Sequence, residues 1–391
     1  MMIQQGSKCL SHDEVFATAE GLVAEYVSMW VDVCNISSYT ADKAGVDEVG
    51  AYFIKHAQEH GYEIDVHPEE KSGDALTLIM NPQAPGQSVC LSGHMDTVFP
   101  KGLFGEIPTR IEADKIYGPG VCDCKGGLVV AALAMDALER CGYRERPVKL
   151  ILQSDEELSS MPSQKRTVEY MAKMAEGCAA FINLEGATPG YHIIERKGIR
   201  RYEVDVYGKA AHSSKPHLGV NAIVEAAHKI AALAAWKAPE GVTVNVGTIE
   251  GGNAANTVAE HCQFVVDFRY VDPSQVNEID AIMQTIVRKS LLEGARSILK
   301  VRSERVCMAP LERNKRLIER LNAAYLQAGL SPVLPGKATG GSDAADMSAH
   351  GIAVVDNVGA VGGRIHSTEE YAEIASLLDN AKRLISAILY L

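Results

Sequence analysis

Short apolar runs alternate with longer amphipathic segments through the first half of the chain. The runs are rich in branched and small side chains, which is typical of buried strands. The longer segments repeat apolar residues at helical spacing. We therefore predict strands at residues 74–80, 88–92, 148–153 and 179–184, and helices at residues 12–27, 42–60, 126–140 and 163–175. Alternating strands and helices predict a layered α/β domain.

The pattern changes near residue 198. Apolar and charged residues alternate over 202–206 and again over 262–270, which predicts half-buried strands with one polar face. Helical stripes at about 221–236 and 276–293 complete a small antiparallel sheet with two helices. The chain therefore divides into a first part of one domain (1–197), an inserted domain (198–307) and the second part of the first domain (308–391).

The first pattern resumes after the insertion, with a helix at 314–328 and a strand at 352–355. A long helix is predicted to close the chain. Ser367 and Glu370 have the spacing of a capping box, so we expect this helix to begin beside them.

Composition narrows the class of protein. The chain has 391 residues, enough for two domains, and 47% of them are hydrophobic. A net charge of -12 argues against nucleic acid or an anionic membrane surface as a partner. The N-terminus lacks the pattern of a signal peptide, the apolar runs are too short to span a bilayer, and the nine cysteines are scattered. We expect a soluble, cytoplasmic protein with reduced thiols.

Metal-binding residue types occur in five segments, most of them just past an apolar strand: SGHMD, GVCDCKGG, SDEE, NLEG and GGRIH. Because ligands bind at the carboxyl ends of strands in open α/β sheets, these segments can converge on one site. The candidate side chains are His94, Asp96, Asp123, Glu156, Glu157, Glu185 and His366. Mixed imidazole and carboxylate ligands suit zinc and its neighbours, and a carboxylate can bridge two ions.

Each feature has an ordinary interpretation when taken alone. A His-x-Asp pair is usually a hydrogen-bonded surface pair, and Asp-Glu-Glu is usually a solvated charge run. Cys122 and Cys124 are interpreted as packing residues, because no second cysteine pair accompanies them. Adjacent Glu156 and Glu157 would repel each other unless one binds a cation and the other acts as a general base. The combination, in order and at strand ends, indicates a metal site.

The chain resembles the co-catalytic zinc metallopeptidases, which include glutamate carboxypeptidase, acetylornithine deacetylase, succinyl-diaminopimelate desuccinylase and aminoacylase. The matching motifs lie in family order between about residues 90 and 371: LSGHMDTVFP, IYGPGVCDCKGG, SDEE, NLEG, YGKAAHSSKPHLGVNAI, GGNAANTVAE, VDFRYV, TGGSDAA and GAVGGRIHSTEEY. The acidic pair departs from the family pattern, because Leu158-Ser159-Ser160 replaces x-Gly-Ser. We expect this loop to bend differently.

The resemblance implies two divalent ions, zinc by expectation and cobalt or manganese as alternatives. Asp123 would bridge them, and a cis peptide would follow it. His94 with Glu185 would complete one ion's ligands, and Glu157 with His366 the other's.

Three further groups of roles are implied. Asp96 would orient His94 and Glu156 would be the general base acting with a hydroxide between the metals. His212 would reach the active site of the neighbouring subunit and stabilise the oxyanion. The substrate's carboxylate and carbonyl would be held by Asn256, Arg269, Arg196 and the backbone of Gly341.

The implied fold is a catalytic α/β domain with a central mixed sheet flanked by helices. An α+β lid or dimerisation domain, with a four-stranded antiparallel sheet and two helices, would be inserted into it. A homodimer is therefore expected. The implied reaction cleaves an amide or peptide bond next to a free carboxylate, in a small anionic peptide or N-acyl amino acid. In this family, glutamate at Glu185 goes with carboxypeptidases and deacylases, whereas aminopeptidases carry aspartate.

Other functions stay open. Within the hydrolases these are a biosynthetic deacylase of the acetylornithine deacetylase or succinyl-diaminopimelate desuccinylase type, and a dipeptidase. Outside them, a metal-binding regulatory or scaffold protein would lack a base or a ligand, and none is missing here. A nucleotide-binding protein is disfavoured, because the glycines lack phosphate-loop spacing.

Overall fold

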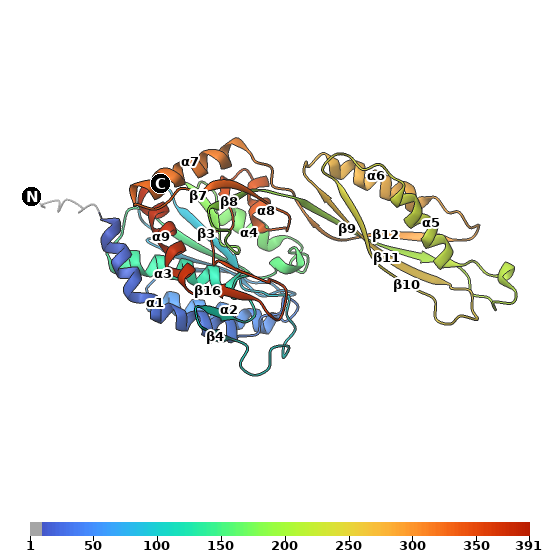
Figure 1. The fold of residues 1–391 in the computed structure, drawn as a ribbon, viewed down its shortest axis with the longest axis horizontal. Helices are drawn as coiled ribbons and strands as arrows, with labels where there is room; N and C mark the ends of the chain where they lie inside the picture. The colour runs from blue at the N-terminus through green and yellow to red at the C-terminus, as the bar shows by residue number, and fades with distance from the viewer. Residues whose placement is uncertain (1–9) are drawn as a thin grey trace, which may run out of the picture. The chain divides into compact units, whose positions relative to one another are not determined.

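The computed structural model describes residues 10–391, which form two compact units (Figure 1). The first unit contains the described residues up to Ile194, together with Pro310–Lys337 and Ser342–Leu391. The second unit contains Glu195–Ala309 and the short segment Ala338–Gly341.

The first unit is built on a six-stranded mixed sheet. Its strand order is β1 (Glu63–His67), β2 (Ala75–Met80), β6 (Val148–Gln153), β3 (Val89–His94), β7 (Ala180–Asn183) and β14 (Val354–Val355). The strands from β1 to β6 pair antiparallel, and those from β6 to β14 pair parallel. Every residue of β2, β3 and β7 is buried, because layers of helix cover the sheet. The predicted central mixed sheet is confirmed.

The helices of this unit are α1 (His12–Asn35), α2 (Lys43–Glu59), α3 (Lys125–Arg140), α4 (Arg166–Met174), α7 (Glu312–Gln327), α8 (Asp343–Ala349) and α9 (Ala375–Tyr390). Helices α1, α3 and α9 pack against one another, and α3 contacts β3 and β6 (Figure 1). Helix α4 contacts β6 and β2, while α7 and α8 contact β14. The predicted helix at 12–27 is longer than expected, since α1 continues to Asn35.

Two glycines allow α3 to begin close to the strand ends. A Cβ at Gly127 would lie 2.1 Å from the backbone oxygen of Leu184, and a Cβ at Gly126 would lie 2.1 Å from that of Val121. Any larger residue would push the helix away from the backbone that precedes Glu185. The Gly-Gly pair therefore sets how near the start of α3 comes to the carboxyl end of β7.

Smaller strands complete the first unit. A second sheet has the order β15 (Gly362–Gly363), β16 (Tyr371–Glu373), β5 (Lys115–Tyr117) and β4 (Arg110–Glu112). Strand β13 (Leu334–Ala338) pairs with β8 (Tyr191–Arg196), and η1 (Glu156–Leu158) is a 3-10 turn after β6.

The second unit contains a four-stranded antiparallel sheet and two helices. The strand order is β10 (Thr243–Gly251), β11 (His261–Tyr270), β9 (Gly198–Tyr207) and β12 (Arg296–Arg305). Apolar side chains of one sheet face are buried with residues of α5 (Ala222–Ala234) and α6 (Gln275–Arg288). A short 3-10 turn, η2 (Pro216–Leu218), precedes α5. This confirms the predicted sheet with two helices, although α6 ends at Arg288 rather than near residue 293.

The prediction for the final helix was wrong at its start. Helix α9 begins at Ala375, and residues Tyr371–Glu373 form β16 instead of a first turn. Pairing of β16 with β5 satisfies the extended backbone there, so tertiary contact overrides the local capping signal. The Glu370 side chain accepts hydrogen bonds from the backbone of Cys122 and Asp123 rather than capping a helix.

Within residues 10–391, no helix has both the length and the apolar composition needed to cross a membrane. The eight cysteines of this described range are free thiols, and Cys9 lies outside it.

Candidate active site

The predicted metal-binding side chains of the first unit meet at the carboxyl ends of its strands. His94 is the last residue of β3, Glu157 lies in η1 after β6, and Glu185 follows β7 by two residues. Asp123 directly precedes the segment that starts α3, while His366 lies on the connection between β15 and β16. Parallel strands bring these distant segments to one edge of the sheet.

Asp123 is at the centre of this cluster. Its Oδ1 lies 3.1 Å from Nε2 of His94, and its Oδ2 lies 3.1 Å from Nε2 of His366. Nε2 of His94 is also 3.7 Å from Oε1 of Glu185, and Nε2 of His366 is 3.1 Å from Oε2 of Glu157. One carboxylate thus lies between two groups, each made of one histidine and one glutamate.

The electrostatics of the cluster favour a cation. Burial raises the pKa of Glu185 well above its usual value, and the charge of Asp123 adds to this; the same two causes raise the pKa of Glu157. Hydrogen bonds to Asp123 and Glu157 raise the pKa of His366 to about 11. Burial alone would lower the pKa of His94, but its polar neighbours raise it well above the usual value. Crowded carboxylates with imidazole nitrogens directed at them form a donor set that fits divalent metal ions.

The groups able to hold a metal by geometry include His94, Asp123 and Glu157, and also His94, Cys124 and Glu185. Cys124 is fully buried, and its Sγ accepts a hydrogen bond from the backbone of His94 at 3.3 Å. The peptide bond between Asp123 and Cys124 is cis, as the resemblance implied.

A third such group among the described residues lies apart from this cluster, at the C-terminal end of α3. It contains His60, Asp136 and Glu139. Asp136 also accepts hydrogen bonds from Oη of Tyr26 at 3.1 Å and Nε of Arg140 at 3.0 Å. Its charge is therefore already paired, and we interpret the group as a hydrogen-bonded network.

Asp96 connects the histidine end of the cluster to the acidic pair. Its Oδ1 lies 3.3 Å from Nδ1 of His94 and accepts a hydrogen bond from the backbone of Glu156 at 3.2 Å. Its Oδ2 accepts from the backbone of Glu157 at 3.1 Å and from the hydroxyl of Thr40 at 2.7 Å. A single buried carboxylate thus holds β3 and η1 together. Nothing in the sequence marked Thr40.

In the second unit, His212 and Asn256 lie on neighbouring loops. The backbone of Ser213 donates to the backbone oxygen of Asn256 at 2.9 Å, and His212 forms a β-bridge with Thr257. His212 is exposed, and its Nδ1 accepts from the backbone of Ser214 at 3.2 Å. Because a backbone N–H can only donate, the neutral imidazole carries its proton on Nε2.

Arg196 and Arg269 contact the short segment of residues 338–341 in the second unit, which ends at Gly341. Arg196 donates from Nη1 to the backbone oxygen of Gly340 at 3.0 Å, and Arg269 donates to that of Thr339 at 3.4 Å. A Cβ at Gly341 would lie 3.1 Å from Arg305.

Arg269 has a carboxylate partner within its own strand. Its Nε donates to Oδ1 of Asp267 at 2.7 Å. The sequence contained a signal for this ion pair, because residues two apart in a strand share a face.

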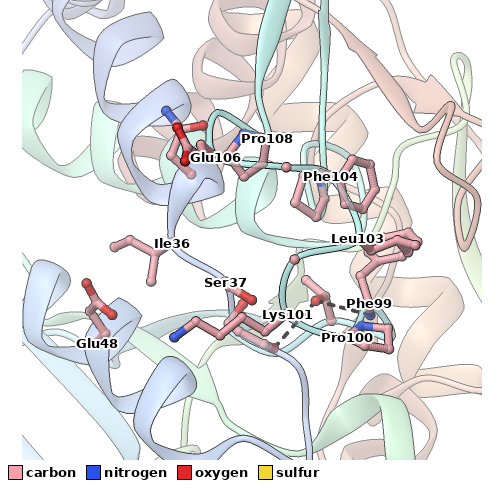
Figure 2. A pocket seen from close by; sticks show the side chains of 16 residues that line it. Ile36, Ser37, Glu48, Phe99, Pro100, Lys101, Leu103, Phe104, Glu106 and Pro108 are labelled. Atoms are coloured by element: carbon pink, nitrogen blue, oxygen red, sulfur yellow. Dashed lines mark hydrogen bonds between the residues drawn. The ribbon is translucent and has the colours of Figure 1, made fainter.

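A cavity of 410 Å³ lies beside the Asp96 segment in the first unit. Figure 2 shows it between the 99–108 loop and residues 35–38, with Glu48 on a further side. Thr97, the residue after Asp96, contributes to its wall, and Ile36, Phe99 and Phe104 make much of the lining apolar.

Three comparisons place this architecture among known proteins. The sequence profile of peptidase family M20/M25/M40 matches residues 90–390. Carboxypeptidase G2 of Pseudomonas sp. (strain RS-16) is 29% identical over 369 residues, covering 90% of this chain and 86% of that protein. An acetylornithine deacetylase of Photorhabdus laumondii is 29% identical over 281 residues, covering 66% and 70% of the two chains. The structure of a family M20 metallo-carboxypeptidase from Sulfolobus solfataricus superposes with a TM-score of 0.73 at 18% identity, covering 94% of this chain and 99% of that one.

The first unit gathers histidines and carboxylates at its strand ends, a donor set that fits divalent metal ions. The family match covers most of the chain. The protein belongs to peptidase family M20/M25/M40, and it is a metallopeptidase or amidohydrolase.

Proposed function

We propose that the first unit binds two divalent cations and hydrolyses an amide or peptide bond next to a free carboxylate. Asp123 would bridge the ions, with His94 and Glu185 completing one set of ligands and Glu157 and His366 the other. One observation carries this proposal: the two oxygens of Asp123 each lie 3.1 Å from Nε2 of a different histidine. Zinc suits these ligands, and cobalt and manganese are the alternatives.

Bound there, the cations would polarise the scissile carbonyl and lower the pKa of a water molecule. Glu156 is the general base: its carboxylate accepts a proton from the attacking water and later delivers it to the departing amine. The backbone N–H of Glu156 donates to Asp96, and Glu156 is buried. Both facts support a fixed orientation of Glu156 beside the proposed ligands. Asp96 orients His94 through Nδ1, which lies 3.0 Å from the backbone oxygen of Asp96 and 3.3 Å from its Oδ1, leaving Nε2 directed toward Asp123.

The second unit would recognise the substrate. His212 carries its ring proton on Nε2, which suits donation to a developing oxyanion. Arg269 and Arg196 would hold the substrate carboxylate, and Asn256 with the backbone of Gly341 would bind its carbonyl groups. Guanidinium groups bind carboxylates through paired, charge-assisted hydrogen bonds. Binding would require Arg269 to exchange or share its contact with Asp267.

The substrate class follows from the anionic group that these arginines would hold. Small peptides with a free C-terminus and N-acyl amino acids both fit, and the names carboxypeptidase G2 and acetylornithine deacetylase cover both types. A biosynthetic deacylase or a dipeptidase is therefore the alternative. Measuring amine release from a panel of N-acyl amino acids and dipeptides distinguishes them. The cytoplasmic location expected from the sequence stays a prediction.

The metal requirement and the roles of the acidic residues can be tested together. Chelation should abolish hydrolysis, and added zinc or cobalt should restore it. Glu156→Gln should keep its metal but lose kcat by about a hundredfold to ten-thousandfold, because it lacks only the proton carrier. Asp123→Asn should lose metal itself, since both ions share that carboxylate. Equal metal loss in both variants, or full turnover by metal-free protein, would refute these assignments.

We further propose a homodimer in which His212 acts in the partner's active site. Each site would then combine Glu156 of one protomer with His212 of the other. His212→Ala and Glu156→Gln should be nearly inactive as homodimers. After subunit exchange, half of the dimers are mixed and each has one intact site, so activity should recover to roughly a quarter of wild type. Verified exchange without recovery would reject the arrangement in trans.

A further inference from the structure

Glu370 connects two metal-binding segments that lie far apart in the sequence. Its Oε1 accepts hydrogen bonds from the backbone N–H groups of Cys122 at 2.9 Å and Asp123 at 3.1 Å. The residue is 1% exposed, so these bonds are shielded from water. Both donors belong to the loop that presents the Asp123 carboxylate to the histidines.

The backbone around Glu370 fastens the same loop to the segment that carries His366. The backbone oxygen of Glu370 accepts from the N–H of Gly118 at 3.2 Å, and β16, which follows, pairs with β5. On its other side, the N–H of Glu370 donates to Ser367, the residue after His366, at 3.1 Å. His366 itself lies on an irregular connection between β15 and β16, with a left-handed backbone (φ 61°).

We propose that Glu370 is a positioning residue for the metal centre, which clamps the Asp123 loop to the His366 segment through Oε1. This inference rests on the proposed ligand roles of Asp123 and His366, and it concerns a residue outside that ligand set. Glu370 contacts the backbone of Asp123, so its effect on the ions is indirect. Loss of the clamp lets Asp123 and His366 move relative to each other, and the ligands are then no longer held at the spacing one ion requires.

Two substitutions separate the reach of the side chain from its charge. Glu370→Gln keeps the chain length and a carbonyl oxygen able to accept both N–H bonds. Oε2 is buried without a hydrogen-bond partner, so an amide nitrogen in its place breaks no bond, although its buried N–H groups should lower the unfolding free energy. Glu370→Asp keeps the charge but withdraws the carboxylate by about 1.5 Å, the length of one C–C bond, which is too far for either hydrogen bond.

The experiment measures cobalt binding by equilibrium dialysis and the cobalt absorption spectrum, on full-length protein whose folding is verified by circular dichroism. Glu370→Asp should weaken cobalt affinity by about ten- to hundredfold and change the ligand-field bands, whereas Glu370→Gln should lose less than about tenfold. In turnover assays kcat should fall with little change in KM, because the substrate-binding residues are untouched. Glu369→Asp is the matched control: its side chain is 56% exposed, and wild-type affinity is expected.

The proposal requires that Glu370→Asp lose more cobalt affinity than Glu370→Gln. Wild-type cobalt affinity and spectrum in a folded Glu370→Asp protein would overturn the proposal. If Glu370→Asp does not fold, the test is Glu370→Gln. A Gln variant that loses as much cobalt as Asp123→Asn would overturn the proposal, because a side chain of the right length would then fail to hold the metal ligands in place. Failure of the proposed function is a separate result: cobalt bound through Asp123 without hydrolysis of any substrate in the panel would leave the clamp intact.

Discussion

The Asp96→Asn substitution tests how one buried carboxylate organises the metal centre. Asp96 is fully buried, and its two oxygens face Nδ1 of His94, the backbone N–H groups of Glu156 and Glu157, and the hydroxyl of Thr40. An amide in place of the carboxylate has only one oxygen. Its NH₂ group must therefore face donors on one side or the other.

The less costly orientation places the amide oxygen toward His94 and Glu156. The NH₂ group then faces Thr40, whose hydroxyl can rotate and accept, and the N–H of Glu157, which cannot. One buried N–H without an acceptor costs about 1–3 kcal/mol of unfolding free energy. Because this N–H belongs to Glu157, a proposed ligand, metal affinity should fall by about ten- to hundredfold.

Urea unfolding of the metal-free protein measures the first effect, and equilibrium dialysis with cobalt measures the second. Asp155→Asn provides the control, because Asp155 is equally buried but faces one N–H (Ser163, 2.9 Å) and one hydroxyl (Thr167, 2.8 Å). Its amide can satisfy both, so unfolding free energy should change little. Equal stability loss in the two variants, or wild-type cobalt affinity in Asp96→Asn, would refute the reasoning.

The other predictions concern stability of the first unit. Burial and then the charge of Arg383 lower the pKa of His192 to about 3, so the folded state keeps it neutral. The unfolding free energy should therefore fall by up to about 5 kcal/mol as the pH falls from about 6.5 toward 3, because in that range only the unfolded chain protonates His192. If His192→Gln has the same dependence of unfolding free energy on pH as wild type, this prediction is wrong. Ser159 adopts a left-handed conformation (φ 57°), so Ser159→Gly should raise the unfolding free energy by up to about 1 kcal/mol. Ser160 has a similar φ of 54°, but its hydroxyl accepts a hydrogen bond from Gln153 at 3.3 Å, so Ser160→Gly should lower the thermal stability. Higher stability of both glycine variants in thermal unfolding would refute this difference between Ser159 and Ser160.

Much of the fold could be predicted from local sequence pattern. Strands β2, β3, β6 and β7 are short apolar runs. The alternation of apolar and charged residues over 202–206 indicated a strand of the second sheet with one buried face. These signals are local, because the spacing of apolar residues along a short segment indicates both its secondary structure and its buried face. The candidate ligands were also recognisable, since each stands in a motif near a strand end.

Other features depend on segments that meet only after folding. Ser367 and Glu370 have the spacing of a helix cap, yet β16 pairs with β5, and α9 begins at Ala375. The contacts of Glu370 with Cys122 and Asp123 join residues separated by 248 and 247 positions. Local propensity could not reveal them, because it contains no information about which distant segment will be adjacent.

The same reason explains the environment of Asp96. The sequence predicts a carboxylate two residues after His94, at the end of a buried strand. The donors to that carboxylate are known only from the folded chain: they are Thr40, which lies 56 positions away, and the backbone of η1. Hydrogen bonds of this kind require a particular path of the chain, and that path is set by the packing of the whole unit around its sheet.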